Sequence, residues 1–338
     1  MTLYCGIDLH SNNSLVSIID EHDRIVYEKR LANDLATIRQ PLLVYQDQLA
    51  GVVVESTYNW YWLVDGLSAS GVDVRLANTV ALKQYNGLKY TDDKTDARYL
   101  AHLLRLGILP EGYVLPFDTR CVRDLFRRRL LLVRQRVMQH LSLQSLITRH
   151  TGQRLTGPRV RALKVEDLST LVSHPSAQLS ARIAHELIGS LGEAIERIER
   201  HVATFCQPIP EHAVIRSIKG IGPILGQSIV LETGPIERFA SVNNYASYAR
   251  CVPSQKISNG KKKGEGNRKN GNKYLEYAFM EAAHYAAIWE PKIKRYYQRK
   301  AQRTHKMVAK KAVANKLAKA CYHMLTRNEP FDVNRAFA

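Results

Sequence analysis

The first residues of the chain alternate short apolar runs with polar breaks, a pattern typical of strands. Residues 3–8, 14–19 and 24–31 each have the length and apolar content of a strand. The polar residues 20–23 separate the second run from the third and predict a hairpin turn. The chain is therefore expected to open with three antiparallel strands.

Beyond residue 33 the hydrophobic period switches between that of helices and that of buried strands. Helices are expected over residues 34–48, around Trp60 and over residues 93–106, and strands over residues 51–55 and 72–77. Ser56 and Thr57 are the residues expected to cap the helix around Trp60. This order of elements predicts a ribonuclease-H-like α/β domain over residues 1–118.

The middle of the chain has the pattern of two long amphipathic helices. Apolar residues recur at helical spacing at Val122, Phe126, Leu130, Val133, Val137 and Leu141, and again at Ile183, Leu187, Leu191, Ile195, Ile198 and Val202. A polar connection that contains Gly and Pro separates them around residues 151–158. Residues 119–208 are therefore expected to form a helical hairpin, either within one chain or as an antiparallel coiled coil between subunits.

The last third begins after Pro208-Ile209-Pro210 and is predicted to be mainly helical. Its one predicted interruption is a loop rich in Gly, Lys and Asn over residues 253–272. Residues 209–338 are expected to form a third domain.

Charge is distributed unevenly along the 338 residues. The chain has 49 Lys and Arg against 31 Asp and Glu, a formal net charge of +18, which suits a polyanionic partner such as a nucleic acid. Residues 1–100 carry a net charge of −4, so the remainder carries +22. This asymmetry favours metal chemistry in the first part and contact with a phosphate backbone in the rest.

Other features of the composition narrow the class of protein. The five cysteines are scattered without a Cys-x-x-Cys pair, which argues against a zinc site and a disulfide framework. No apolar run reaches the length of a membrane span, and no signal peptide opens the chain. We expect a bacterial-type cytoplasmic protein that associates with the nucleoid and not with a membrane.

Four acids fall at positions where they are expected to converge. Asp8 ends the first strand, Glu55 ends the fourth, and Asp93 and Asp96 lie one helical turn apart at the start of a helix. Like charges about 4 Å apart repel by about 1–4 kcal/mol per pair, so such a cluster requires a cation. Oxygen ligands select Mg²⁺ or Mn²⁺. Taken singly, each acid is more often a turn or capping residue, and Asp92 also shares a helix face with Asp96.

At these acids the sequence resembles a known family. Gly6-Ile7-Asp8, the segment 54–57 and the segment 91–98 are similar to the Asp-Glu-Asp-Asp motif of the IS110 family of insertion-sequence transposases. The N-terminal domain of that family is similar to the Holliday-junction resolvase RuvC. The resemblance implies a DNA recombinase with a helical linker used in oligomerisation and a C-terminal transposase domain. It also implies a structured guide RNA from the element, and it favours Asp93 over Asp92 as the ligand.

The segment 218–224 resembles the hairpin of a helix-hairpin-helix element. Gly220 and Gly222 would let backbone N–H groups approach a phosphate at a helix N-terminus, with Lys219 beside them. A glycine-containing helix connection without a binding role is the alternative.

Ser258 lies in the loop over residues 253–272, directly before the tight-turn pair Asn259-Gly260. The basic residues around it are Lys261, Lys262, Lys263, Arg268, Lys269 and Lys273. A serine that attacks phosphorus needs nearby cations and a proton acceptor, and this loop supplies the cations. From the residues alone Ser258 is an ordinary turn residue, with Ser254 as a second candidate nucleophile.

The resemblance places Ser258 on the catalytic serine of the family, five residues after the matching Pro253. The family often has glycine directly after this serine, whereas here Asn259 precedes Gly260. This departure puts the geometry of the loop in question.

Between Glu290 and Glu329 the chain carries twelve Lys and Arg and no acid, with Tyr296, Tyr297 and Tyr322 among them. A basic helical surface with aromatic side chains suits a nucleic-acid backbone and stacked bases. A solvated basic face whose apolar side packs inward is the simpler interpretation, and it is compatible with binding.

Together with the resemblance, these patterns predict a transposase or recombinase that performs metal-dependent strand transfer through a transient phosphoserine. Because the acids and the serine are far apart in sequence, we expect a composite active site. The expected partners are donor and target DNA, a guide RNA and further copies of the chain as a dimer or tetramer. The alternatives are a structure-specific nuclease that resolves junctions with metal-activated water, and a non-catalytic nucleic-acid-binding protein.

Overall fold

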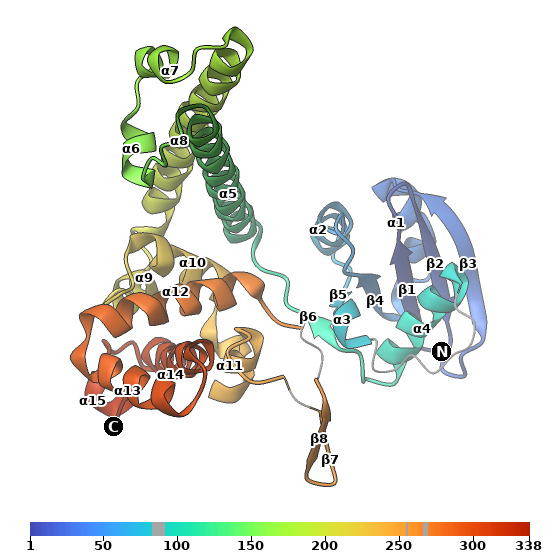
Figure 1. The fold of residues 1–338 in the computed structure, drawn as a ribbon. Coiled ribbons are helices and arrows are strands. Elements are labelled where there is room, and N and C mark those ends of the chain that lie inside the picture. The colour runs from blue at the N-terminus through green and yellow to red at the C-terminus, as the bar shows by residue number, and fades with distance from the viewer. Residues whose placement is uncertain (83–91, 255, 266–269) are drawn as a thin grey trace. The chain divides into compact units, whose positions relative to one another are not determined.

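The computed structural model describes residues 1–82, 92–254, 256–265 and 270–338 (Figure 1). The chain divides into two compact units, Met1–Val114 and Leu115–Ala338. The first unit contains a mixed sheet, and the second is mainly helical, so the predicted change from α/β to helical structure is confirmed. No helix among the described residues is long and apolar enough to cross a membrane.

The first unit is built on a six-stranded sheet with the order β3-β2-β1-β4-β5-β6. The strands are β1 (Leu3–Leu9), β2 (Asn13–Ile19), β3 (Ile25–Ala32), β4 (Leu49–Glu55), β5 (Val74–Ala77) and β6 (Glu111–Gly112). The first three are antiparallel, as predicted, and β4 and β5 continue the sheet in parallel from β1. The two-residue β6, which the sequence pattern did not predict, pairs antiparallel with β5.

Helices cover both faces of this sheet. They are α1 (Leu35–Val44), α2 (Tyr61–Ala69), α3 (Thr79–Leu82) and α4 (Asp93–Arg105), with a short 3₁₀ turn, η1 (Gln46–Gln48). Successive residues of β4 point to opposite faces, so Val52 and Val54 pack with α1 and α2, while Val53 packs with Leu100 of α4. The predicted helices and strands are thus present, with α1 shorter than expected.

The predicted cap of α2 is wrong. That helix begins at Tyr61 after Trp60, which makes no side-chain capping bond. The preceding polar residues serve a turn instead: the Thr57 hydroxyl donates to Asn59 Oδ1, and Asn59 Nδ2 donates to the backbone carbonyl of His10. This segment therefore anchors the end of β1.

Gly6 allows α4 to lie directly on β1. A Cβ atom at this position would be 2.0 Å from the carbonyl oxygen of Ala97 and 2.8 Å from the amide nitrogen of Ala101. Because backbone atoms cannot yield as a flexible side chain does, only glycine fits here. The close packing brings the first turn of α4 next to the end of β1.

The second unit begins with two long antiparallel helices, α5 (Phe117–Thr151) and α8 (Pro175–Cys206), which pack along each other (Figure 1). The predicted connection is wider than expected and contains α6 (Gly157–Ala162) and α7 (Val165–Leu171). Both short helices contribute to a small core with Leu143 and Ile147 of α5. The intramolecular hairpin, one of the two expected arrangements, is therefore present.

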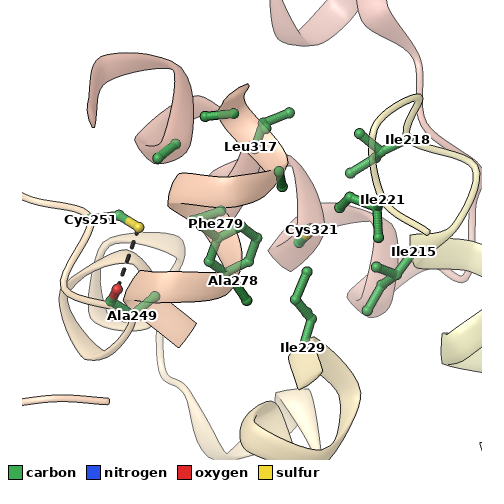
Figure 2. Packing of buried hydrophobic residues seen from close by; sticks show 14 of the residues in the cluster. Ile215, Ile218, Ile221, Ile229, Ala249, Cys251, Ala278, Phe279, Leu317 and Cys321 are labelled. Atoms are coloured by element: carbon green, nitrogen blue, oxygen red, sulfur yellow. Dashed lines mark hydrogen bonds between the residues drawn. The ribbon is translucent and has the colours of Figure 1, made fainter. Parts of the chain in front are cut away.

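The remaining helices form the largest core of the molecule. They are α9 (Pro210–Ile215), α10 (Pro223–Thr233), a 3₁₀ turn η3 (Ile236–Arg238), α11 (Val242–Tyr248), α12 (Lys273–Trp289), α13 (Pro291–Arg303), α14 (Lys306–Arg327) and α15 (Val333–Ala336). Figure 2 shows Phe279 of α12 and Leu317 of α14 within this core. Between α11 and α12 the chain forms a two-stranded hairpin, β7 (Lys256–Ser258) and β8 (Lys261–Gly264).

Candidate active site

Three of the four predicted acids interact at one edge of the sheet in the first unit. Because β1 and β4 are parallel and Ile7 pairs with Val54, Asp8 and Glu55 end up side by side. The Asp8 side chain is buried, and it shares a hydrogen bond with the carboxyl group of Glu55. Asp96 of α4 is close enough for its charge to act on Glu55.

Burial and neighbouring acids raise the pKa values of Glu55 and Asp96. Burial, the hydrogen bond to Asp8 and the charges of Asp8 and Asp96 raise the pKa of Glu55 to about 8. Partial burial and then the charge of Asp8 raise the pKa of Asp96. The cluster is therefore unfavourable when fully ionised, and a bound cation would relieve the repulsion.

The fourth acid, Asp93, lies beside a histidine that sequence reasoning missed. His10 Nε2 is 3.2 Å from an oxygen of Asp8 and 3.2 Å from an oxygen of Asp93. Arg30 donates to the same Asp93 oxygen, and this bond, together with His10, lowers the pKa of Asp93. His10 follows Asp8 by two residues at the end of a strand, and that spacing could have identified it because such residues share one face.

Asp92, the alternative ligand, has a different role. Its carboxylate caps α4 and accepts hydrogen bonds from Thr95 N at 2.8 Å and from Thr95 Oγ1 at 2.6 Å. Capping orients this carboxylate toward the first turn of the helix, whereas that of Asp93 faces His10. The structure thus groups Asp93, and not Asp92, with Asp8.

This cluster fits a divalent cation. One potential ligand atom each from Asp8, His10 and Asp93 lies within 4.8 Å of the other two, and Glu55 adjoins Asp8. Carboxylate oxygens suit Mg²⁺ and Mn²⁺, and the imidazole nitrogen is more readily accepted by Mn²⁺. With His10 included, the donor set is not the oxygen-only set expected from the sequence.

The raised pKa of Glu55 predicts a pH-dependent affinity for divalent ions. Below pH about 8 the ion must displace the Glu55 proton, so affinity should rise by up to about tenfold per pH unit and level off above pH 8. In metal-free protein the folded state holds this proton more tightly than the unfolded state, whose pKa is near 4.5. Stability without metal should therefore fall as pH rises from about 4.5 to 8.

Calorimetric titration with Mn²⁺ and thermal unfolding, each between pH 6 and pH 9, would measure the two effects. Glu55→Gln cannot ionise and serves as the control, because it should remove most of both pH dependences. Equal slopes in the variant and the wild type would contradict the assignment of the raised pKa to Glu55.

In the second unit, Ser258 occupies the predicted tight turn. It is the last residue of β7 and pairs with Lys261 of β8, and the two residues between them have positive φ angles, +50° at Asn259 and +69° at Gly260. These angles are those of a type I′ hairpin turn, which asparagine and glycine accept. Asn259, the departure from the family pattern, is therefore compatible with a regular hairpin.

The basic residues around Ser258 are described only in part. Ser258, Lys261 and Lys263 are exposed, and Ser254, the second candidate nucleophile, is half-buried. Lys273 begins α12, with its ammonium 5.2 Å from the ring centre of Tyr274. Arg268, Lys269 and the side chain of Lys262 lie outside the described residues.

In the segment 218–224, which leads into α10, packing explains one of the two glycines. Gly220 has φ +103°, and a Cβ there would be 2.5 Å from the amide nitrogen of Ala286 in α12. Ile218 and Ile221 face the core on either side of it (Figure 2), and Lys219 is 3.1 Å from Glu290. Packing on α12 therefore accounts for Gly220, while Gly222 has open space beside it.

The aromatic residues of the basic helices are not arranged as the sequence suggested. Tyr296 and Tyr297 of α13 and Tyr322 of α14 pack against the hydrophobic core, so the inward-packing interpretation holds for these three. Exposed aromatic side chains occur instead on α12, at Tyr277, Tyr285 and Trp289, where Trp289 is 65% exposed.

Two family models of transposases match the parts of the chain that contain the two candidate sites. The model of the DEDD-type transposase domain of IS110 elements matches residues 5–151, which include the four acids, and the model described as the transposase IS116/IS110/IS902 family matches residues 212–298, which include Ser258. A probable family 20 transposase of Pseudomonas aeruginosa PAO1 is 24% identical over 340 residues, covering 95% of this chain and 96% of that protein. A transposase acts on DNA, and a DEDD-type domain together with the Asp8, His10 and Asp93 group indicates use of a divalent metal ion. The chain therefore belongs to the IS110 family of insertion-sequence transposases.

Proposed function

We propose that this transposase cleaves and rejoins DNA with a divalent ion held by Asp8, Glu55, Asp93 and Asp96 and with Ser258 as the nucleophile. The observation that carries the proposal is the grouping of Asp8, Glu55 and Asp96, in which burial and the two neighbouring acids raise the pKa of Glu55 to about 8. Such a costly arrangement of carboxylates is typical of a metal-assisted active site. The strand order of the sheet, with three antiparallel strands followed by parallel β4 and β5, supports a RuvC-like assignment of the first unit.

In the proposed reaction the Ser258 oxygen forms a bond to a DNA phosphorus, and the bond from that phosphorus to the leaving sugar oxygen breaks. The serine proton passes to a base, and the leaving oxygen takes up a proton. A hydroxyl group of a second strand then displaces the serine, so one phosphodiester replaces another. A divalent ion, when bound by the acids and by His10, supplies positive charge that stabilises the transferring phosphoryl group.

Strand-transfer assays test this proposal against its nuclease alternative. Labelled donor and target DNA are incubated with the protein and its co-purified nucleic acid, in Mg²⁺, in Mn²⁺ or with a chelator. Joined products that require metal support a transposase of this mechanism. Cleaved DNA without joined products would favour the junction-resolving nuclease. No cleavage in Mg²⁺, in Mn²⁺ or with the chelator would favour a non-catalytic binding protein.

We further propose that a structured RNA guides the choice of target. The strong positive charge of the chain beyond residue 100 supports binding of a second nucleic acid besides DNA. Sequencing of RNA that co-purifies with the protein tests this: one enriched RNA from the flank of the element is expected. Recovery of only bulk cellular RNA would contradict it.

Lys261, Lys262 and Lys263 are expected to contact phosphates and not base edges. A lysine is a flexible point charge without base preference, so replacing all three by Ala should weaken binding to every DNA sequence by a similar factor. The slope of log affinity against log salt should become shallower by about 2–3, roughly 0.9 for each lost phosphate contact. Fluorescence anisotropy at several salt concentrations measures both, and loss at a single target with an unchanged slope would contradict this role.

The helical hairpin is proposed to join subunits through its exposed apolar face. Near the base, Phe126 and Val202 are buried, but further out along α8 Leu179, Ile183 and Leu187 remain 60%, 48% and 42% exposed. On α5, Val137, Met138 and Leu141 are also apolar and exposed. A second hairpin would cover this face, in agreement with the coiled-coil alternative.

Ile183→Glu and Leu187→Glu together should therefore dissociate the oligomer. Each apolar side chain buried between subunits contributes about 1.5–3 kcal/mol, so each change should raise the dissociation constant by at least about tenfold. Light scattering after gel filtration measures the mass, with the exposed Glu193→Gln on the same helix as the control. An unchanged oligomeric mass in the double variant would exclude this face as the interface.

A further inference from the structure

An ion pair between a half-buried arginine and a buried glutamate connects the long helix α5 to α10. Arg127 of α5 donates through Nε and Nη2 to the two carboxylate oxygens of Glu232, each at 2.6 Å. The Glu232 side chain is 4% exposed, and the Arg127 guanidinium also lies over the ring of Tyr274, 4.4 Å from its centre. Two parallel hydrogen bonds in a site with little water fix both the distance and the orientation of the partners.

Asn272 connects this ion pair to the end of the loop over residues 253–272, which carries Ser258. Its Nδ2 donates to Glu232 Oε2 at 2.7 Å, and its Oδ1 accepts from the amides of Tyr274 and Leu275, which caps α12. Asn272 is 7% exposed. One side chain thus holds the start of α12 and joins it to the ion pair.

The two ends of the segment that carries Ser258 are tied together at the same place. The backbone amide of Asn272 donates to the carbonyl oxygen of Tyr248, and Arg250 Nε donates to the carbonyl oxygens of Asn270 and Gly271 at 3.1 and 3.0 Å. Gly271 has φ +89°, and a Cβ there would be 2.6 Å from the Tyr248 carbonyl oxygen. We call these five residues, 248, 250 and 270–272, the neck.

The neck is also anchored in the core of the second unit. Cys251, which follows it directly, is buried there and donates to the carbonyl oxygen of Ala249 at 3.4 Å (Figure 2). The β7–β8 hairpin with Ser258 therefore extends from a base whose position is set by α11, by α12 and, through Glu232 and Arg127, by α5.

We propose that Arg127, Glu232 and Asn272 are positioning residues that fix the neck of the serine hairpin relative to α5. This inference rests on the proposed function, in which Ser258 is the nucleophile. The rate of attack depends steeply on the position of the reacting oxygen, and a displacement of about 1 Å can cost about 10²-fold. The same connection joins the helix of the proposed subunit interface to the hairpin, so a shift of α5 is transmitted to the neck.

Asn272→Ser tests the connection without removing the helix cap. Serine also caps helices well, but it is too short to keep the Nδ2 bond to Glu232. We expect DNA affinity within about twofold of the wild type, while adduct formation at saturating DNA slows by about 10–100-fold. Amide hydrogen exchange over residues 256–264 should accelerate in the free protein.

Arg127→Gln provides the second variant, because it leaves the neck intact and removes only its tie to α5. The matched control is Arg129→Gln, since Arg129 lies on the same helix and pairs with Glu199 of α8 at 2.6 Å instead of with the neck. Arg127→Gln should behave as Asn272→Ser does, and Arg129→Gln should keep wild-type rates and exchange over residues 256–264. Arg127→Lys, which keeps the charge but not the two-bond geometry, should recover only part of the rate.

Wild-type adduct rates and wild-type exchange in Asn272→Ser would overturn the inference, as would equal effects of Arg127→Gln and Arg129→Gln. If Ser258→Ala still forms the adduct, the proposed nucleophile is wrong. In that event hydrogen exchange alone still decides whether Arg127 and Asn272 hold the hairpin, so the two failures are distinguishable.

Discussion

Replacing Asp8, Glu55 or Asp96 by Ala is expected to abolish strand transfer, with losses of at least about 10²–10³-fold for each variant. Each change removes one member of a set whose charges act on one another, so no single carboxylate is redundant. DNA binding should persist, because we propose that it depends on the basic remainder of the chain. The measurement is joined product per unit time in Mg²⁺ and in Mn²⁺.

Thermal unfolding separates this loss of activity from loss of fold. Without metal and at pH 9, where Glu55 is ionised, Asp8→Asn should unfold at the same or a higher temperature than the wild type, because it removes a charge that repels Glu55. Asp92→Ser is the matched control on α4, since serine preserves the cap that Asp92 provides and leaves the acid cluster complete. Near-wild-type activity in any two of the three alanine variants would contradict a shared metal site.

The grouping of the acids could be predicted from the sequence because strand periodicity is a local property. Asp8 and Glu55 each follow a run of apolar residues that are buried on both faces of the sheet, so their placement at strand ends could be predicted without the fold. His10 was missed because a lone histidine after a strand is ordinary. What places it in the site is the anchoring of its backbone carbonyl by Asn33 and Asn59, which lie far from it in sequence.

The predictions for the cap of α2 and for the tyrosines of the basic helices were wrong for one reason. The amino-acid composition of a segment does not specify which way its side chains point. Ser56 and Thr57 have the chemistry of helix caps, but the turn before α2 uses its polar groups to hold the end of β1. The tyrosines at 296, 297 and 322 lie among basic residues in the sequence but face the core, because their helices pack that side inward. Only the packed structure decides such orientations.

The contacts that hold the base of the β7–β8 hairpin could not be predicted from the sequence. Arg127, Glu232 and Asn272 are separated by 105 and 40 residues and occur on three different elements. The sequence patterns gave no role to any of the three, and an arginine in a basic helix is ordinarily solvated. By contrast, the turn at Asn259-Gly260 was predictable because two consecutive residues with positive φ require those residue types.

Ser258→Ala is expected to leave DNA and RNA binding intact and to eliminate the covalent protein–DNA adduct. The substitution removes only the attacking oxygen from an exposed turn residue, so the β7–β8 hairpin and its lysines should be unaffected. Ser258→Cys should retain slow activity at most, because a thiolate is a good nucleophile but reacts poorly at phosphorus. Ser254→Ala should stay active, which controls for general damage to the loop.

Denaturing electrophoresis of protein with labelled DNA and Mg²⁺ detects the adduct directly, since only a covalent link survives unfolding. The wild type and Ser254→Ala should give a band of protein size carrying the DNA label, and Ser258→Ala should give none. Because binding is measured separately, a missing band cannot be attributed to weaker affinity. An adduct in Ser258→Ala would move the nucleophile to another residue, and cleavage by the wild type without any adduct would mean that water, and not serine, attacks the phosphodiester.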